Sequence, residues 1–211
     1  MSIGSRSFMV LAWIAAVLCI LVTLASYRFV PLGVQASMDF LAHHLPDNRW
    51  FLYAHIAVAP LALALLPVQL NGRLRKRYPK LHRWAGRFYV FLIALSGVAA
   101  LQLAATTQAG PVAAAGFALL GVIWLIVTGL GFLTGWKRDF VQHRCWMIRS
   151  AALTFAAVTL RVYLPLSMVL GLPFDPAYTV IAWLCWVPNL IAAEIYLRGG
   201  SRMNQRVTPV A

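Results

Sequence analysis

The sequence predicts an all-α, polytopic membrane protein with six transmembrane helices, and three observations support this prediction. First, 62% of the 211 residues are hydrophobic and 11% are charged, whereas soluble domains average about 45–50% and about 25%. Second, the apolar residues come in uncharged blocks of roughly twenty, the helix length that crosses about 30 Å of hydrocarbon. Third, these blocks show no period-two alternation, which excludes a transmembrane β-barrel.

The six blocks are expected to form the membrane helices of one domain over residues 1–211. They lie at about residues 8–27, 50–70, 84–105, 112–135, 145–168 and 177–197, followed by a tail at 198–211. The first block resembles a signal peptide, but it is longer than the usual apolar region of about 7–15 residues and lacks a small-x-small cleavage site. We therefore expect it to remain as the first membrane helix.

Between the first two blocks, residues 31–46 are expected to form a short amphipathic helix on the membrane surface. Its apolar residues recur at helical spacing: Val34, Met38, Leu41 and Leu45. His43 and His44 lie in the same segment, and we expect both to face solvent.

The basic residues gather on one side of the membrane if six helices alternate. Residues 71–87 carry seven Lys and Arg without an acid, and residues 137–149 carry four more. By the positive-inside rule this side is cytoplasmic, and so are both termini. The formal net charge of +13 is therefore attributed to topology and to anionic lipid, and nucleic acid is not an expected partner.

Ionisable residues at membrane depth are the most informative ones, because they are costly there and usually face the bundle interior with a partner. These residues are His55, His82, His143, Arg161 and Glu194. His82 and His143 begin the third and fifth helices, at similar depth on the cytoplasmic side. His55 and Arg161 lie in the outer half. Glu194 is expected to pair with a residue one turn on, Arg198.

Helical spacing places two of these groups on one helix face. His143 and Arg161 are 18 residues apart, which is five turns of a straight helix, so they are expected to share the interior face of the fifth helix. Met147 lies near the same stripe. On the third helix, Gly86 follows His82 by one turn and begins a small-residue groove that admits a neighbouring helix or a flat macrocycle.

Imidazoles from two helices are typical axial ligands of haem b. We therefore expect His82 and His143 to bind the haem iron, with Gly86 and Met147 beside them. Arginines of the same end would lie near the haem propionates: Arg83, Arg87, Arg144 and Arg149. The alternative is that both histidines are interfacial residues that bind lipid headgroups.

The outer pair, His55 and Arg161, is expected to form a quinone or substrate pocket, or else a structural polar contact. Arg161 lies too deep to reach the interface easily, so it needs an anionic, carbonyl or dipolar partner. The cysteines are well separated and form no Cys-x-x-Cys pair, so inert thiols are expected at Cys19, Cys145 and Cys185. No hydrolytic constellation or phosphate-binding loop is present.

The polar motifs resemble a known family. The segments His82–Tyr89, Gly116–Trp124, His143–Ser150 and Thr159–Arg161 look like the bacterial predicted membrane proteins of domain of unknown function 2306, over residues 50–165. The resemblance implies a bacterial inner-membrane location and no particular activity. More loosely, the histidine-arginine start of the third helix is similar to cytochrome b and transmembrane ferric reductases, which implies haem.

The function that these observations favour is electron transfer between quinol or quinone and a partner, through haem b. A quinone-linked oxidoreductase activity would be one form of it. Two alternatives stay open: a carrier in which Arg161 and His55 bind an anionic substrate, and a non-redox accessory subunit of a larger membrane complex. The carrier is disfavoured by the lack of an inverted repeat and of paired broken helices in the sequence.

Overall fold

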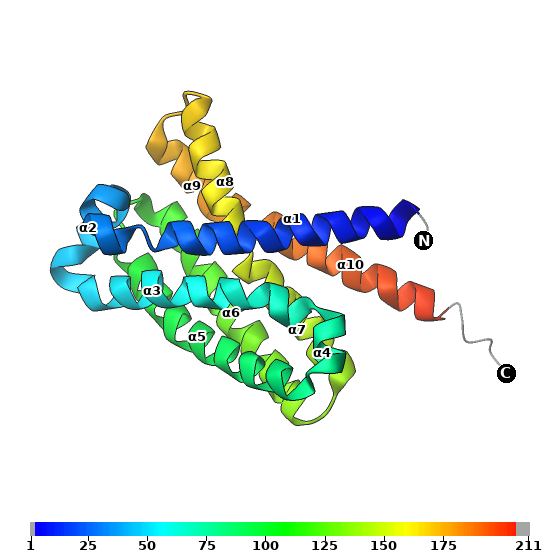
Figure 1. Cartoon of the computed structure of the whole chain (residues 1–211). Helices are drawn as coiled ribbons and strands as arrows, with labels where there is room; N and C mark the ends of the chain where they lie inside the picture. The colour runs from blue at the N-terminus through cyan, green and yellow to red at the C-terminus, as the bar shows by residue number, and fades with distance from the viewer. Residues whose placement is uncertain (1–2, 206–211) are drawn as a thin grey trace.

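The computed structural model describes residues 3–205, and the side chains of residues 9–199. Within this part of the chain the elements are helical and no strand occurs. The helices are, in chain order, α1 (Ile3–Ser26), α2 (Phe29–Ser37), η1 (Asp39–His44), α3 (Leu45–Leu70), α4 (Gly72–Arg77), α5 (Pro79–Ala105), α6 (Gly110–Trp136), α7 (Phe140–Thr154), α8 (Ala156–Val169), α9 (Phe174–Leu184) and α10 (Val187–Gln205) (Figure 1).

Six apolar segments of the described chain are long enough to cross a membrane, which agrees with the all-α, six-helix prediction. They are Met9–Ser26, Asp39–Leu70, Pro79–Ala105, Gly110–Trp136, Phe140–Val169 and Phe174–Gly199. Several helices begin earlier than expected, since Pro46 and Pro79 occupy first-turn positions, where a proline needs no hydrogen-bond donor. The expected tail begins within α10, and residues 206–211 lie outside the described residues.

Helix α4 was not anticipated, because the basic segment between α3 and α5 lacks an apolar face. The Asn71 side chain caps it, accepting hydrogen bonds from the backbone N–H groups of Arg73 and Leu74 at 3.0 Å each. We call the end of the molecule that carries α4 and the α6–α7 turn the basic end, and the end that carries α2 and η1 the far end (Figure 1).

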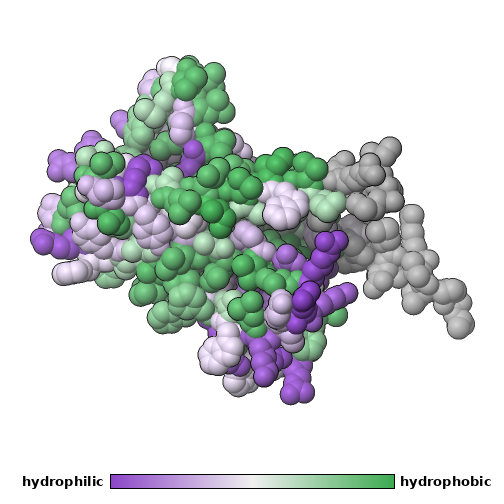
Figure 2. Space-filling view, in the orientation of Figure 1, coloured by the Kyte–Doolittle hydropathy of each residue, from purple (hydrophilic) through white to green (hydrophobic). Residues whose placement is uncertain are grey.

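The central bundle consists of α3, α5, α6 and α7. Its neighbouring pairs are α3 with α5, α5 with α6, and α6 with α7, so α5 and α7 face one another across the interior. Helix α1 packs along α3, and many of its large apolar side chains stay exposed. Figure 2 shows an apolar band between two hydrophilic ends, the surface that a bilayer would cover.

The fifth and sixth spans are both broken in the middle. The fifth consists of α7 and α8, which meet at Phe155, and the sixth consists of α9 and α10, which meet at Cys185 and Trp186. Helices α8 and α9 pair with one another and depart from the direction of the bundle (Figure 1). The prediction of one straight fifth helix is therefore wrong, and His143 and Arg161 do not lie along one continuous helix face.

Both breaks have local causes. Pro188 has no N–H for the carbonyl of Leu184, so its ring interrupts the sixth span just before α10. The fifth span bends where two threonines bond back to their own helix: Thr154 Oγ1 donates to the Ser150 carbonyl at 2.9 Å, and Thr159 Oγ1 to that of Ala156 at 3.2 Å. Such back-bonding bends helices.

The two breaks lie against each other. Side chains donate hydrogen bonds to the backbone carbonyls that lose their helical partners at the breaks. The Cys185 carbonyl also lies within hydrogen-bond distance of Thr159 Oγ1, which shares its one proton between this carbonyl and that of Ala156. Asn189 Nδ2 has three acceptors within reach for its two protons: the Cys185 carbonyl at 3.0 Å, Thr159 Oγ1 at 3.2 Å and the Ala152 carbonyl at 3.4 Å. Broken membrane helices are stable only where neighbours satisfy the freed backbone groups in this way.

The expected surface helix over residues 31–46 is instead two short helices, α2 and η1. A glycine with φ of +75°, Gly33, interrupts the first, a conformation that favours glycine. Val34 and Met38 are buried against Leu52 and other residues of α3 and α5. The apolar face predicted for this segment therefore packs on the protein and covers the far end of the bundle.

The expectation that His44 faces solvent is wrong, because this residue is only 2% exposed. Its ring lies against that of His43, with 3.9 Å between the centroids, and its Nδ1 is 3.3 Å from Thr106 Oγ1. The neighbouring His43 is half-buried and accepts a hydrogen bond from the Gln108 N–H at 3.4 Å. Both histidines thus tie η1 to the α5–α6 connection.

Candidate functional site

A buried hydroxyl network connects α5, α6 and α7 in the middle of the bundle. Tyr89 is 0% exposed, and its Oη lies 3.0 Å from Ser150 Oγ and 2.7 Å from Thr154 Oγ1. Ser150 Oγ is also 2.7 Å from Thr128 Oγ1, and Trp124 Nε1 donates to Thr154 Oγ1 at 2.9 Å. These five side chains bind the three helices to one another.

The available protons give this network one direction. The Thr154 hydroxyl donates to the Ser150 carbonyl, so its oxygen must accept from both Trp124 and Tyr89. The Tyr89 oxygen then accepts from the Ser150 hydroxyl, whose own oxygen accepts from Thr128. Every hydroxyl in the network therefore donates once, and none is left unsatisfied.

This contact determines how His82 and His143 are oriented. Tyr89 follows His82 by seven residues, and Ser150 follows His143 by seven residues, so each pair lies on one helix face two turns apart. Because Tyr89 and Ser150 meet across the bundle, the two histidines lie on the facing sides of α5 and α7. They are also within electrostatic range of each other.

His143 is held in one orientation by α6. Its Nδ1 lies 2.7 Å from the Gly131 carbonyl oxygen, which can only accept, so Nδ1 carries the proton and Nε2 is left with the lone pair. The ring lies against Gly135, where an added Cβ would be 2.8 Å from Nδ1. A histidine that ligates a metal commonly has its other nitrogen bonded in this way.

His82 has the opposite character. Among the described residues, its Nδ1 is the only buried side-chain nitrogen or oxygen without a hydrogen-bond partner. A buried polar atom left unpaired is costly, and it commonly marks a catalytic role, a bound water or a bound ion. The cationic side chain of Arg75, from α4, lies within electrostatic range of this ring.

The other residues predicted beside the histidines are used for helix packing. The slot above Gly86 is filled by the side chain of Gln69, whose Oε1 would be 3.4 Å from an added Cβ. Gln69 Nε2 also donates to the His82 carbonyl at 3.3 Å. The sulfur of Met147 lies over Gly131, where it would be 2.6 Å from an added Cβ.

Three of the arginines predicted near the propionates, Arg83, Arg87 and Arg144, are exposed at the basic end. Arg87 is exposed and stacks on the Trp84 ring, 5.1 Å from its centroid. Arg144 is exposed and donates to Tyr196 Oη at 2.9 Å.

The two histidines at the basic end fit the role of axial ligands to haem iron. The space beside them accommodates the haem macrocycle less completely. His143 presents a fixed Nε2 lone pair, and His82 lies opposite it with an unpaired ring nitrogen. The flat space beside them would require the flexible Gln69 side chain to turn away from Gly86. Among the described residues, no group of three or more His, Cys, Asp or Glu side chains could hold a bare metal ion.

The second predicted pair lies toward the far end. His55 on α3 has its Nδ1 3.0 Å from the Ser96 carbonyl of α5, so Nδ1 donates and Nε2 keeps the lone pair. Arg161 on α8 lies within electrostatic range of the His55 ring. The break at Phe155 therefore does not separate His55 from Arg161, although His55 lies on α3 and Arg161 on α8.

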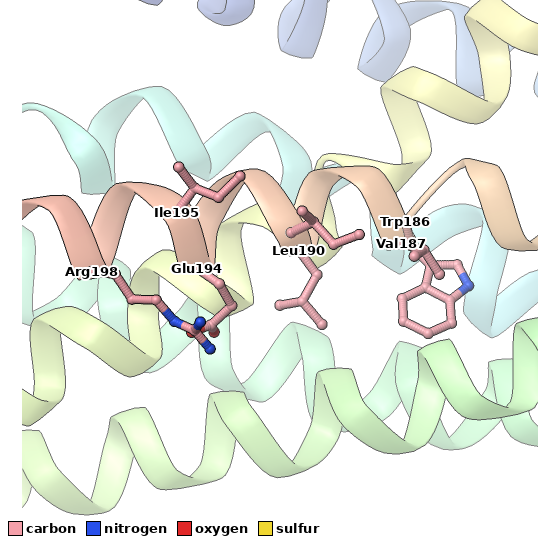
Figure 3. Close-up of a pocket in the computed structure, with 7 residues that line it drawn as sticks. Trp186, Val187, Leu190, Glu194, Ile195 and Arg198 are labelled. Carbon is pink, nitrogen blue, oxygen red and sulfur yellow. The ribbon is translucent and has the colours of Figure 1, made fainter.

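The ion pair of Glu194 differs from the expected one. Glu194 binds Arg149 of α7, with 2.5 Å from Nε to Oε1 and 3.1 Å from Nη2 to Oε2. Arg198 also lies at this end of α10, beside Glu194 (Figure 3). Glu194 and Arg198 are the charged residues that line an otherwise apolar pocket of about 390 Å³ along α10. Trp186 and Leu190 are among its apolar lining residues. A bidentate pair between helices is stronger than the predicted pair within one helix.

Sequence reasoning missed the hydroxyl network and the role of Asn189. The network could have been suspected from Tyr89 and Ser150, polar residues inside apolar blocks that follow His82 and His143 by seven residues, and Asn189 from its own position inside an apolar block. Their partners could not be inferred, because those partners lie on other helices.

The apolar spans, the interior histidines and the positive end define a polytopic helical membrane protein. The chain belongs to the family described as predicted membrane protein (DUF2306), whose model matches residues 52–197. This match covers more than half of the chain and extends past the predicted limit of residue 165 to include the sixth span. No curated protein and no solved structure matches the chain.

Proposed function

We propose that this protein binds haem b between His82 and His143 and transfers electrons between quinol or quinone and a partner. The observation that supports the proposal most directly is the facing pair of imidazoles, one fixed by the Gly131 carbonyl and the other with an unpaired buried nitrogen. Ligation by two histidines leaves no open iron position, so the bound haem would act as a one-electron carrier.

The surrounding residues would hold the ligands in place. The Gly131 carbonyl holds the His143 ring through Nδ1 and leaves Nε2 for the iron, and Gly135 gives the ring room. The Tyr89 network, two turns away, fixes the distance between α5 and α7. Quinone would interact at His55, whose free Nε2 can accept a hydrogen bond or a proton from a quinol hydroxyl.

We also propose a bacterial inner-membrane location with the basic end in the cytoplasm. The described helix α1 begins, and α10 ends, at the basic end, so both termini would be cytoplasmic (Figure 1). The positive-inside rule supports this orientation, because the residues of α4 and of the α6–α7 turn are rich in Lys and Arg.

A reduced-minus-oxidised visible spectrum of the purified full-length protein tests the haem proposal, with a pyridine haemochrome assay to count haem. One haem b per chain with a sharp reduced α-band is expected. His82→Ala and His143→Ala should each remove that band, whereas His55→Ala should keep it and slow reduction by quinol. A protein that stays colourless after haem is supplied would refute the proposal. Equal loss in all three variants would place His55 among the ligands.

The second candidate function is a small-molecule or anion carrier, and the paired breaks of the fifth and sixth spans favour it. Carriers commonly bind their substrate between discontinuous helices, and here the breaks at Phe155 and Cys185 meet near Arg161. Uptake of a radiolabelled organic anion into vesicles that contain the protein would favour this function, provided that Arg161→Gln abolishes the uptake.

A further inference from the structure

Two arginines and a histidine lie in the same region toward the far end of the bundle. Arg28 lies two residues after the end of α1, and the charge of Arg161 on α8 lies within electrostatic range of both Arg28 and His55. The backbone supports this proximity. Tyr27 Oη donates to the Ala57 carbonyl at 2.7 Å, which anchors the end of α1 beside the turn of α3 that carries His55. Helix α1 also contacts α8.

Although Asp39 lies in η1 at the same end, neither arginine forms a salt bridge with a carboxylate among the described residues. The only salt bridge found there joins Arg149 and Glu194, at the other end of the molecule. The whole chain has only five acidic residues. Two guanidinium groups brought together without an acid repel each other, and a charge at membrane depth normally has a partner.

Arg161 does not extend toward the membrane boundary. It lies eight residues before the end of its span at Val169, about 12 Å along the helix. Its Nη1 donates to the Ala157 carbonyl, four residues earlier, at 3.1 Å, so the side chain is turned back toward the interior. A snorkelling arginine extends instead toward the interface, so the Arg161 guanidinium stays within the span.

Arg28 is oriented by hydrogen bonds before any ligand binds. Its Nε and Nη2 donate to the Ser37 carbonyl at 3.0 Å and 2.8 Å, and its Nη1 donates to the Ala25 carbonyl at 3.4 Å, so the guanidinium is held between α2 and the end of α1. The side chain is exposed at the far end, so it offers a ligand a route from that side. An exposed and a half-buried guanidinium at the same end give this region a positive potential that attracts anions.

We propose that Arg28 and Arg161 bind an oxyanion at the far end, either a phosphate or carboxylate in solution or the phosphate of a lipid headgroup. Guanidinium groups bind such oxygens with paired, charge-assisted hydrogen bonds. A quinone is neutral and cannot compensate two positive charges, so the oxyanion occupies Arg161, and His55 remains the quinone contact. The site goes beyond the electron-transfer proposal and does not depend on haem.

The test measures thermal stability of the full-length protein in neutral detergent, through the fluorescence of its eight tryptophans. Sodium phosphate is compared with sodium chloride at equal ionic strength, and phosphatidylglycerol with phosphatidylcholine in mixed micelles. A ligand that binds the folded state raises the melting temperature with its concentration. Stabilisation by phosphate would identify an oxyanion in solution, and stabilisation by phosphatidylglycerol alone would identify a headgroup.

Three variants assign the effect to the site. Arg28→Gln and Arg161→Gln should each weaken the stabilising affinity by at least about tenfold, since a hydrogen bond to a charged group is lost. Arg49→Gln, an exposed arginine of the same end, is the matched control and should leave it unchanged. If neither probe stabilises the protein, or if all three variants behave alike, the site does not exist.

The unliganded variants provide a further criterion. Without ligand, Arg161→Gln should melt at or above the temperature of the unchanged protein, because an uncompensated charge is removed and a donor to the Ala157 carbonyl is kept. A large decrease would mean that Arg161 has a structural role, and the proposal would be overturned.

Discussion

Tyr89→Phe tests whether the hydroxyl network connects α5 to α7. The substitution keeps the buried ring and removes one oxygen, which takes part in two hydrogen bonds: one with Ser150 at 3.0 Å and one with Thr154 at 2.7 Å. Thr154 keeps its bonds to Trp124 and to the Ser150 carbonyl. The Ser150 hydroxyl loses its acceptor in a fully buried site.

The expected loss follows from these two bonds. Hydrogen bonds between membrane helices contribute about 0.6 kcal/mol on average and about 1.7 kcal/mol at most. Two of them amount to about 1–3 kcal/mol of unfolding free energy. The lower figure applies if the Ser150 proton turns to a carbonyl of its own helix, and the upper one applies if it stays unpaired.

The assay is equilibrium unfolding in mixed micelles, and Tyr53→Phe serves as the control because that tyrosine is 39% exposed. The double variant Tyr89→Phe with Ser150→Ala removes the stranded donor, so its cost should be smaller than the sum of the single costs. Strictly additive costs, or a loss no greater than that of Tyr53→Phe, would refute the network as a connection between α5 and α7.

Two further predictions concern the basic end. Gly135→Ala should lower haem content or shift the spectrum, because a Cβ there would be 2.8 Å from His143 Nδ1. Gly129→Ala on the same helix is the control: its added Cβ meets nothing within 4 Å, so the spectrum should stay unchanged. Equal spectra for the two variants would contradict the position of the His143 ring. Glu194→Gln should cost only about 0.2–1 kcal/mol of unfolding free energy, because its pair with Arg149 is partly exposed, and raised salt should shrink the difference. A cost of several kcal/mol would mean that the pair is shielded from solvent.

The candidate site was predictable to the extent that it depends on single helices. His82 and His143 stand out because they are ionisable residues in an apolar chain, and their matching depth follows from counting helices. Their facing geometry needed Tyr89 and Ser150, which meet only when α5 and α7 lie across the bundle. The environment of Gly86 was not predictable, because Gln69 comes from α3.

The wrong predictions share a physical cause. A straight fifth helix was the simplest continuation of an apolar block, but the bend at Phe155 depends on threonine bonding and on Asn189 from α10. The solvent-facing His44 and the Glu194–Arg198 pair were inferred from neighbours in the sequence. In the structure, Thr106 and Arg149, which are distant in the sequence, are the partners of His44 and Glu194.

The sequence by itself determined the membrane class, the six spans and the basic end, because transfer into hydrocarbon depends on composition and length, which are local properties. The tertiary structure alone decided which polar groups meet. It brought His82 opposite His143, placed the two broken spans against each other, and gathered Arg28, Arg161 and His55 without a salt bridge to a carboxylate among the described residues. Polar contacts inside a membrane protein depend on the packing of helices far apart in the chain, and apolar periodicity does not encode that packing.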